Sequence, residues 1–317
     1  MSRTGVCRVA LVGLVVAAGL VGGCKDDRPT IGLSVLTTNN PFFNDIGEAM
    51  QAEAEKHGWD VIVMDGDNDP AKQQAQVKDF ITRECIAIVL TPCDSEAVGA
   101  AIKEANNAGI PVFTADIASE AEDAEVVSHI ATDNLGGGVL ACKAMVQGLK
   151  ARGDATGEIA IIDHPLIESV KLRTKGFKAQ LAKENAADDV DLKIVKQLPG
   201  KGEQAASERV MRDILVSNPN IKGVFAINDP TALGAVAALG DKVKDVVVIG
   251  FDGQMLGKQA IKAGQVYADP IQFPRTIGKM TVEAIALFLE GKPVEKEYLI
   301  PTSLYYKADA EKDPELK

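Results

Sequence analysis

Short apolar runs alternate with amphipathic segments through most of the chain. Residues 31–36 form an apolar run of strand length. The next segment, 42–57, places Ile46, Met50 and Ala54 on one helical face and charged residues on the other. The same alternation predicts strands at 59–64, 86–90, 110–115 and 126–130, and helices at 70–84 and 94–108. Strands separated by helices are typical of a parallel sheet covered by helices.

The alternation starts again after residue 133, which predicts a second sheet. The further helices are expected at 134–151, 168–185, 203–217, 230–239, 254–263 and 274–290. The strands between them are expected at 158–163, 190–196, 221–227, 245–251 and 265–271, followed by extended segments around 297–306. This pattern predicts an α/β protein with two doubly wound parallel-sheet lobes joined by a hinge, and a first crossing near 131–134.

The lobes are expected to share the chain unevenly. We assign residues 30–132 plus 273–300 to an N-terminal lobe and residues 133–272 plus 301–310 to a C-terminal lobe, with 311–317 as a flexible tail. Chain ends that carry many charges are commonly frayed.

The first residues do not fit the alternation. Arg3 and Arg8 precede an apolar run at 9–21. This run is too short to span a bilayer, which needs about 20 residues, and the combination is typical of secretory signal peptides. Small residues then precede Cys24, as in the bacterial lipobox, whose cysteine is lipidated and begins the mature protein. We therefore expect a lipoprotein signal peptide at 1–23 and an exported, periplasmic protein anchored to a membrane by lipid. An ordinary signal peptide with an incidental cysteine is the alternative.

Charge and cysteine content narrow the functional classes. The 317 residues carry a net charge of −11, which argues against nucleic acid or an anionic membrane surface as partner. Cys85 and Cys93 flank a predicted strand and would lie roughly 20 Å or more apart, too far for a disulfide. With Cys142 they are expected to be free, buried thiols. No cysteine and histidine cluster has metal-site spacing, so we expect no metal and no cofactor.

Three motifs suggest chemistry but have simpler explanations. Residues 136–141 match the G-x-G-x-x-A pattern of dinucleotide sites, yet an N-cap and close helix packing account for them. The acidic run 65–69 resembles a calcium loop but lacks the required Gly and Glu, which favours a turn with an N-cap. Asp163 and His164 could form an acid–base pair, although no nucleophile is tied to them.

Polar residues follow several predicted strands. The loop 37–43 carries asparagines and two adjacent phenylalanines, and other strands are followed by Asp116, Asn228, Asp252 and Gln272. Ligands of parallel sheets bind at the carboxyl ends of strands, and carboxylates, amides and aromatic faces suit a small polyol. The alternative is that the phenylalanines belong to the core and the polar residues are turns and helix N-caps.

These motifs resemble the ribose-binding family of periplasmic solute receptors. The resemblance runs from about residue 30 to residue 301 and rests on N-N-P-F-F at 39–43, D-x-x-N-x-P-A-K at 65–72, V-S-H-I-A-x-D-N at 127–134, V-F-A-x-N-D at 224–229, A-L-G-A at 232–235 and G-F-D-G at 250–253. It implies that the sugar contacts are Asn40, Phe42, Phe43, Asp116, Asn228, Asp252 and Gln272.

The chain departs from this family at three places. The family has arginines where this chain has Ile117 and, by our alignment, Lys171, and a phenylalanine near Gly202. We retain Lys171 as a ligand contact and expect His164 to supply the missing face.

The resemblance implies a receptor of a bacterial ABC importer, expected to be a monomer. Such a receptor captures a small sugar, here a pentose or related monosaccharide, by hinge closure between the lobes and delivers it to a membrane permease. One alternative is a sugar or signal receptor that feeds a sensor or chemotaxis protein. Another is an exported enzyme that uses Asp163 and His164.

Overall fold

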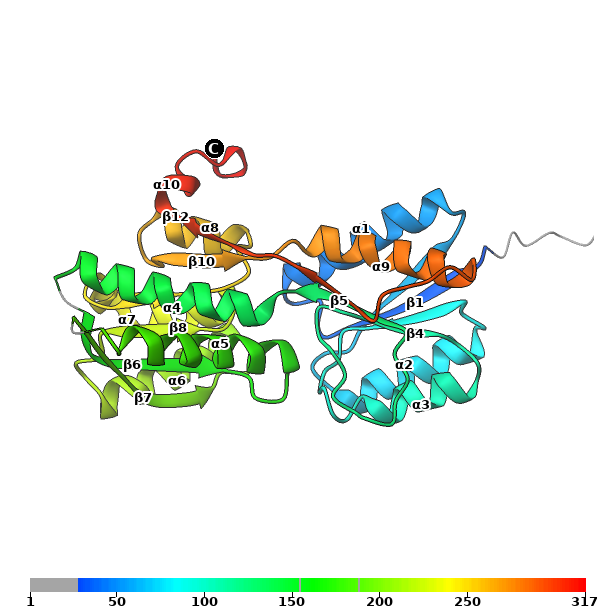
Figure 1. The fold of residues 1–317 in the computed structure, drawn as a ribbon, viewed down its shortest axis with the longest axis horizontal. Helices are drawn as coiled ribbons and strands as arrows, with labels where there is room; N and C mark the ends of the chain where they lie inside the picture. The colour runs from blue at the N-terminus through cyan, green and yellow to red at the C-terminus, as the bar shows by residue number, and fades with distance from the viewer. Residues whose placement is uncertain (1–27, 154, 188) are drawn as a thin grey trace, which may run out of the picture.

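The computed structural model describes residues 28–153, 155–187 and 189–317, and it shows two α/β lobes side by side (Figure 1). The signal peptide and Cys24 lie outside the described residues. The N-terminal lobe contains β1 (Thr30–Val35), α1 (Pro41–Lys56), β2 (Asp60–Asp65), α2 (Pro70–Thr82), β3 (Ala87–Leu90), α3 (Gly99–Asn107), β4 (Val112–Ala115), β5 (Ser128–Thr132), α9 (Pro274–Leu289) and β11 (Glu297–Ile300).

The C-terminal lobe repeats the same architecture. It contains α4 (Asn134–Ala151), β6 (Ala155–Asp163), α5 (Glu168–Glu184), β7 (Val190–Pro199), α6 (Gln204–Ser217), β8 (Gly223–Ala226), α7 (Asp229–Leu239), η1 (Gly240–Lys244), β9 (Val247–Ile249), α8 (Met255–Lys262), β10 (Ala268–Ile271), β12 (Ser303–Tyr306), α10 (Lys307–Ala310) and η2 (Pro314–Leu316). The predicted fold class is thus confirmed.

Each lobe has a six-stranded sheet. The strand order is β11-β5-β4-β3-β1-β2 in the first and β12-β10-β9-β8-β6-β7 in the second. The first sheet is parallel throughout, whereas β12 runs antiparallel to β10 at the edge of the second. Only two residues separate β11 from β12, and the chain passes directly from one lobe to the other between them.

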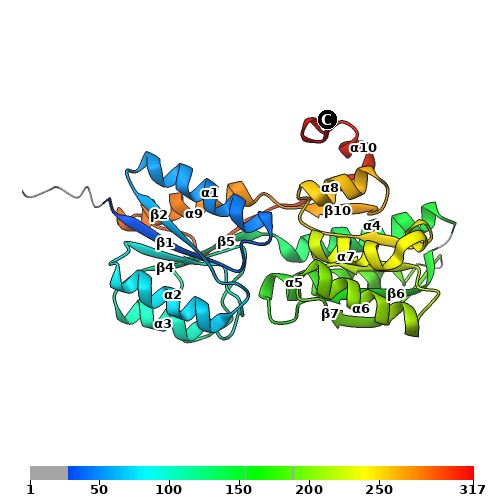
Figure 2. The ribbon, with the colours of Figure 1, turned by 180° about the vertical axis from the view of Figure 1, so that it is seen from behind.

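Alternate residues along a strand point to opposite faces of the sheet and pack against different helices. In β6, Ile159 and Ile161 pack with helices α4 and α5, whereas Ala160 and Ile162 pack with α6, α7 and α8. In the N-terminal lobe, α1 and α9 cover one face of the sheet and α2 and α3 cover the other (Figure 2). Both faces are buried, which explains why the strands read as continuous apolar runs.

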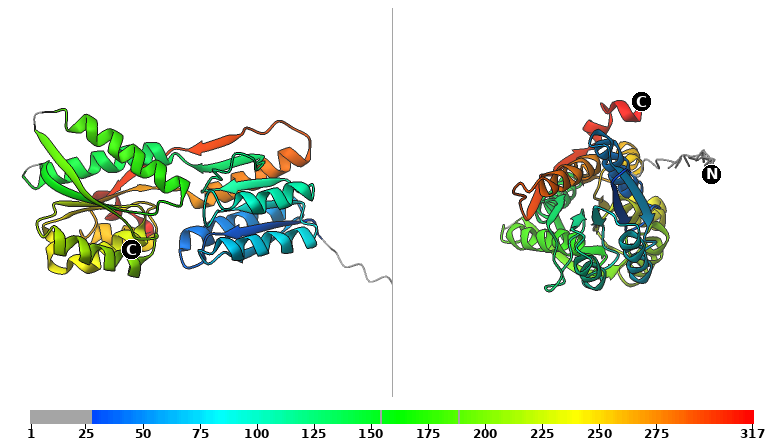
Figure 3. Two further views of the ribbon diagram at one scale, coloured as in Figure 1. Left: turned by 90° about the horizontal axis from the view of Figure 1, so that it is seen from below. Right: turned by 90° about the vertical axis from the view of Figure 1, so that its right-hand side faces the viewer.

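The chain crosses between the lobes after β5, β10 and β11, and Figure 3 shows the lobes end to end with these crossings between them. Helix α9 returns to the N-terminal lobe and lies so close to α1 that a Cβ at Gly278 would be 2.4 Å from the carbonyl oxygen of Ile46. Three crossings of this kind form a hinge, since a few residues can absorb a change in the angle between the lobes.

Two local details differ from the sequence predictions. Helix α3 begins at Gly99 instead of residue 94, because Asp94 accepts hydrogen bonds from the backbone N–H groups of Glu96 and Ala97 and caps a preceding turn. Residues 311–317, for which we expected a flexible tail, contact α8: Lys258 Nζ lies 3.1 Å from Asp313 and 2.8 Å from Glu315. No helix within the described ranges has the length and apolarity to cross a membrane.

Candidate ligand-binding site

A cavity of about 270 Å³ lies between the lobes, close to the small end of the usual range for ligand pockets, about 300–1,000 Å³. Its walls are the loops that follow the strands of both sheets. Of the nine residues predicted to contact a ligand, eight line it: Asn40, Phe42, Phe43, Asp116, His164, Asn228, Asp252 and Gln272.

The loop before α1 has both of the roles suggested by the sequence: its residues cap the helix or belong to the core, and they also line the cavity. Asn40 is the N-cap of α1, and its Oδ1 accepts from the backbone N–H of Phe42 at 3.1 Å, so the donor side of this amide is what a ligand can use. Phe42 and Phe43 belong to the buried core and also line the cavity, with ring centroids 5.3 Å apart in an edge-to-face arrangement. A ring fixed in this way offers a rigid apolar surface to a small ligand.

Asp116 is the charged residue that the N-terminal lobe contributes to the cavity. Its backbone has a φ of +64°, a conformation rarely adopted outside glycine and commonly associated with functional sites. The side chain is 3% exposed, and Oδ1 has no hydrogen-bond partner among the described residues. Burial raises the pKa of Asp116 to about 7, and Asp252 contributes in the same direction against the opposing effect of Arg173.

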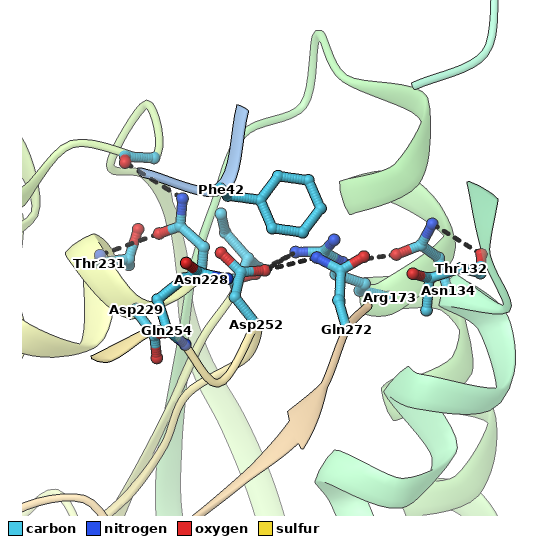
Figure 4. Close-up of polar contacts among 12 residues, drawn as sticks. Phe42, Thr132, Asn134, Arg173, Asn228, Asp229, Thr231, Asp252, Gln254 and Gln272 are labelled. Carbon is cyan, nitrogen blue, oxygen red and sulfur yellow. Dashed lines mark hydrogen bonds and ion pairs between the residues drawn. The ribbon is translucent and has the colours of Figure 1, made fainter. Parts of the chain in front are cut away.

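A row of polar side chains from the C-terminal lobe faces Phe42 (Figure 4). Asp252 Oδ1 accepts from Gln272 Nε2 at 2.6 Å and from the Arg173 guanidinium at 3.3 Å. Gln272 Oε1 has no partner in the described part of the chain. Asp252 also has a positive φ, +102°, and burial raises its pKa to about 6. The row thus presents a carboxylate and an unused amide oxygen to the cavity.

Arg173 is the site residue that the sequence analysis missed. It is 3% exposed, donates to Asn134 Oδ1 and to the carbonyl oxygen of Ile227 at 2.7 Å each, and its Cζ lies 3.9 Å above the Phe251 ring. These contacts hold the guanidinium against Asp252. A signal was present in the sequence, because Val170, Arg173 and Phe177 share one face of α5 and a charged residue on a buried face needs a polar function.

Lys171 was predicted to contact the ligand, and the structure corrects this. Its side chain lies outside the cavity, where Nζ pairs with the carboxylate of Glu120 from the other lobe. Residues two positions apart point to different sides of a helix, so Lys171 cannot share the face of Arg173. Our alignment therefore assigned the arginine position to the wrong side of α5.

His164, Gly202 and Asn228 form one side of the cavity. The Cβ that a side chain would need at Gly202 would lie 3.1 Å from Asn228 Nδ2 and 4.0 Å from the His164 ring. Asn228 Oδ1 accepts from the N–H of Thr231 at 2.9 Å, so this residue is also the N-cap of α7. Burial lowers the pKa of His164, and Lys201 adds to the effect, so the imidazole is neutral at pH 7 and can both donate to and accept from a hydroxyl.

Part of the cavity wall is apolar. Ile117, Ile167 and Val170 line it and are at most 6% exposed. The first comes from the loop after β4 and the others from the start of α5, so both lobes contribute. The cavity wall therefore has polar and apolar parts.

The alternative chemical motifs have structural roles. A Cβ at Gly138 would lie 2.0 Å from the carbonyl oxygen of Arg173, so this glycine allows α4 and α5 to pack closely, and a Cβ at Gly137 would lie 2.5 Å from the Phe251 ring. Asp65 accepts from Thr38 Oγ1 at 2.6 Å and Asp69 caps α2. Asp163 accepts from Gln197 and not from His164, which removes the proposed acid–base pair.

The cysteine and metal predictions can be compared with the described chain. Cys85, Cys93 and Cys142 are free and buried, as predicted. Within the described ranges no group of three or more histidine, cysteine or acidic residues could hold a metal ion.

Comparisons with known proteins agree on one family. Residues 31–293 match the model of the periplasmic binding protein domain. The chain is 35% identical to the ribose import binding protein of Escherichia coli, over 94% of this chain and 97% of the relative. It is 33% identical to a D-apiose import binding protein of Paraburkholderia graminis, over 96% of each chain. A solute binding protein of Actinobacillus succinogenes with bound D-allose superposes with a TM-score of 0.80 at 26% identity, over 90% of this chain and 100% of that one.

Proposed function

The chain belongs to the periplasmic binding protein family, and on that basis we propose that it is the sugar receptor of a bacterial ABC importer. It captures a small monosaccharide between its lobes and delivers it to a membrane permease. The similar proteins named above include import binding proteins for ribose and apiose and a solute binding protein with bound allose, which supports a sugar as the ligand class.

One observation supports the proposal most strongly. Two buried acceptors, Asp116 Oδ1 and Gln272 Oε1, face the same cavity and have no donor among the described protein groups. Buried acceptors without donors are costly, so their presence in a pocket indicates a ligand rich in O–H donors. The ring of Phe42 beside them suits the C–H face of a sugar (Figure 4).

The apolar part of the cavity wall favours a particular kind of sugar. A hydroxyl directed at Ile117, Ile167 and Val170 would lose its hydrogen bonds to water without replacement. A pentose or related sugar can turn a ring carbon without a hydroxyl towards this side. We therefore retain the pentose class for the ligand.

Contacts between the lobes support capture by closure. Ser95 of the N-terminal lobe donates its N–H to the carbonyl oxygen of Leu166 at 3.1 Å, and its Oγ accepts from the N–H of Glu168 at 2.9 Å. The second bond caps α5, whose own N-cap residue makes no side-chain cap bond. The ion pair between Lys171 and Glu120 also joins the two lobes. A ligand that contacts both lobes adds its free energy to these contacts and so favours the closed arrangement.

Location, anchoring and assembly complete the proposal. The family is periplasmic, and we infer lipidation at Cys24 and a monomeric state from the sequence alone. A receptor that feeds a sensor protein would use the same cavity. Loss of growth on the sugar when the permease is deleted would distinguish transport from that signalling role. An enzymatic role receives no support, since Asp163 is not bonded to His164.

A thermal-shift screen of the mature chain against pentoses, hexoses and sugar alcohols tests the function. A ligand at 100 times its dissociation constant should stabilise the protein by about 2.7 kcal/mol, a shift of several degrees. We expect such a shift with a pentose or related sugar. If no monosaccharide or polyol raises the melting temperature, the proposal fails.

Sugar affinity should rise with pH through about 7. Hydroxyl donors favour the ionised carboxylate, and Asp116 has a pKa of about 7 without them, so binding releases a proton near neutrality. Affinity at about pH 7 should exceed that at about pH 6 by up to roughly fivefold. Calorimetric titrations in two buffers of different ionisation enthalpy measure the proton release directly. Equal heats in both buffers would contradict the pKa assigned to Asp116.

Ser95→Ala should weaken binding of every sugar by the same factor, roughly fivefold, the equivalent of about 1 kcal/mol for one hydrogen bond. The hydroxyl is buried and bonds to the other lobe, so its loss opposes closure without altering the polar row. Titration calorimetry measures the change, with Ser217→Ala as a control, because the Ser217 hydroxyl bonds only within its own lobe. A factor that differs widely between sugars would indicate direct ligand contact instead.

A further inference from the structure

Two buried carboxyl groups lie behind the polar row of the site. Asp229 is 2% exposed and Asp269 is fully buried. Figure 4 shows Asp229 and Gln254 on the side of Asn228 and Asp252 that faces away from Phe42. Neither carboxyl lines the cavity, so a direct ligand contact does not explain them.

The two carboxyl groups are close enough for each to shift the pKa of the other. Asp229 Oδ1 and both oxygens of Asp269 find no N–H or O–H donor in the described ranges. A hydrogen bond between two carboxyls requires a proton on one of them, as in other buried acid pairs. No described cation meets them either: the nearby Arg173 pairs with Asp252, and Lys258 pairs with Asp313 and Glu315.

The pair connects the three segments that carry the polar residues of the C-terminal lobe. Asp229 follows Asn228 directly, and its Oδ2 accepts from the backbone N–H of Gln254 at 2.6 Å, two residues after Asp252. Asp269 lies in β10, three residues before Gln272.

Glycines make room for both carboxyls. A Cβ at Gly257 would lie 2.0 Å from Asp229 Oδ1, and a Cβ at Gly250 would lie 2.4 Å from Asp269 Oδ1. Side chains at these two positions would displace the pair, so the surrounding backbone is built around it.

We propose that Asp229 and Asp269 are positioning residues of the ligand site, which share one proton and thereby hold the loops of Asn228, Asp252 and Gln272 in register. This inference rests on the proposed function for its ligand. When the shared proton is lost, two adjacent buried charges repel each other, and the three loops separate.

The direction of the pH effect follows from the surroundings. Burial raises the pKa of Asp229 well above its usual value, and the charges of Asp269 and Asp252 add to the effect; burial also raises the pKa of Asp269, to about 6. Asp252 is the other titratable group that faces the pair. A carboxyl with a raised pKa in the fold contributes stability that is lost as the pH rises through that pKa. The stability that the pair contributes should therefore fall as the pH rises from the usual aspartate pKa, about 4, through the raised pKa values of the folded pair, and the ligand affinity should fall when the shared proton is lost.

The variant Asp269→Asn tests the proposal, because an amide can donate to the Asp229 carboxylate without a shared proton. As the pH is raised through the pKa of the pair, we expect the sugar affinity of the unmodified protein to fall by about tenfold or more and its melting temperature to fall as well. This fall in affinity should be absent for Asp269→Asn, which retains only the rise that Asp116 causes near pH 7. Asp245→Asn, at an exposed aspartate of the same lobe, should follow the unmodified protein.

Asp269→Ala removes the partner without replacing its hydrogen bond, so it should lower both the affinity and the melting temperature at every pH. Parallel pH profiles for Asp269→Asn and the unmodified protein would overturn the proposal. A pH profile of melting temperature needs no sugar, so it still tests the pair if the proposed function fails.

Discussion

Asp252→Asn is expected to weaken sugar binding by about 100-fold or more while leaving the fold intact. Asp252 is the charged acceptor of the polar row, and hydrogen bonds to charged groups contribute about 1.5–3 kcal/mol each. The substitution removes the charge that receives sugar hydroxyls and also disturbs Gln272 and Arg173, which both donate to Oδ1. Titration calorimetry with the sugar identified by the thermal screen measures the loss.

Asp213→Asn is the matched control for this prediction, since Asp213 is an exposed aspartate on α6, far from the polar row. Its affinity should equal that of the unmodified protein. If the affinity of Asp252→Asn stays within about threefold of that of the unmodified protein, Asp252 does not contact the ligand.

Asp116→Asn should have opposite effects on binding and on stability. The buried carboxylate has an oxygen without a donor, so its ionisation in this position lowers the stability of the fold. A neutral amide at the same position has no such cost. Asparagine also tolerates the positive φ of this residue better than most residues. We expect sugar affinity to fall by about 100-fold and the melting temperature without sugar to rise by about 2–4 °C, the equivalent of roughly 1 kcal/mol.

Calorimetric binding and thermal unfolding at about pH 8, where Asp116 is ionised, measure both effects. Asp60→Asn, at an exposed aspartate of the same lobe, controls for the change of charge. A lower melting temperature together with unchanged affinity would mean that Asp116 is a structural residue.

Most of the fold and much of the site could be predicted from the sequence, for identifiable reasons. The strands are buried on both faces, so they appear as uninterrupted apolar runs between amphipathic helices. The site residues follow these strands, and parallel strands place all their carboxyl ends at one edge. Asn40 and Asn228 could be assigned both to caps and to the cavity, and the structure shows that one side chain can meet both descriptions.

The errors arose where the three-dimensional direction of a side chain decides the outcome. Lys171 and Arg173 are both basic residues of α5, and sequence alignment alone did not show which one faces the cavity. The position of Phe177 on the buried face could have resolved it, because Arg173 lies one turn away from that residue. The direction of the edge strand β12 was not predicted, since two short extended segments give no indication of their orientation.

The acid pair could be anticipated only in part. Asp269 interrupts an apolar strand, which already suggests a special role for a charged residue at a buried position. Its partner could not be deduced, because Asp229 and Asp269 are 40 residues apart and meet only when β8 and β10 assemble into one sheet.

A crystal structure of the chain with the sugar identified by the thermal screen tests the central claim most directly. The account predicts one sugar between the lobes, with hydroxyls within hydrogen-bonding distance of Asp116 Oδ1 and Gln272 Oε1 and a C–H face against the Phe42 ring. A sugar bound elsewhere on the molecule, or one in the cavity that leaves both acceptors without a donor, would contradict it.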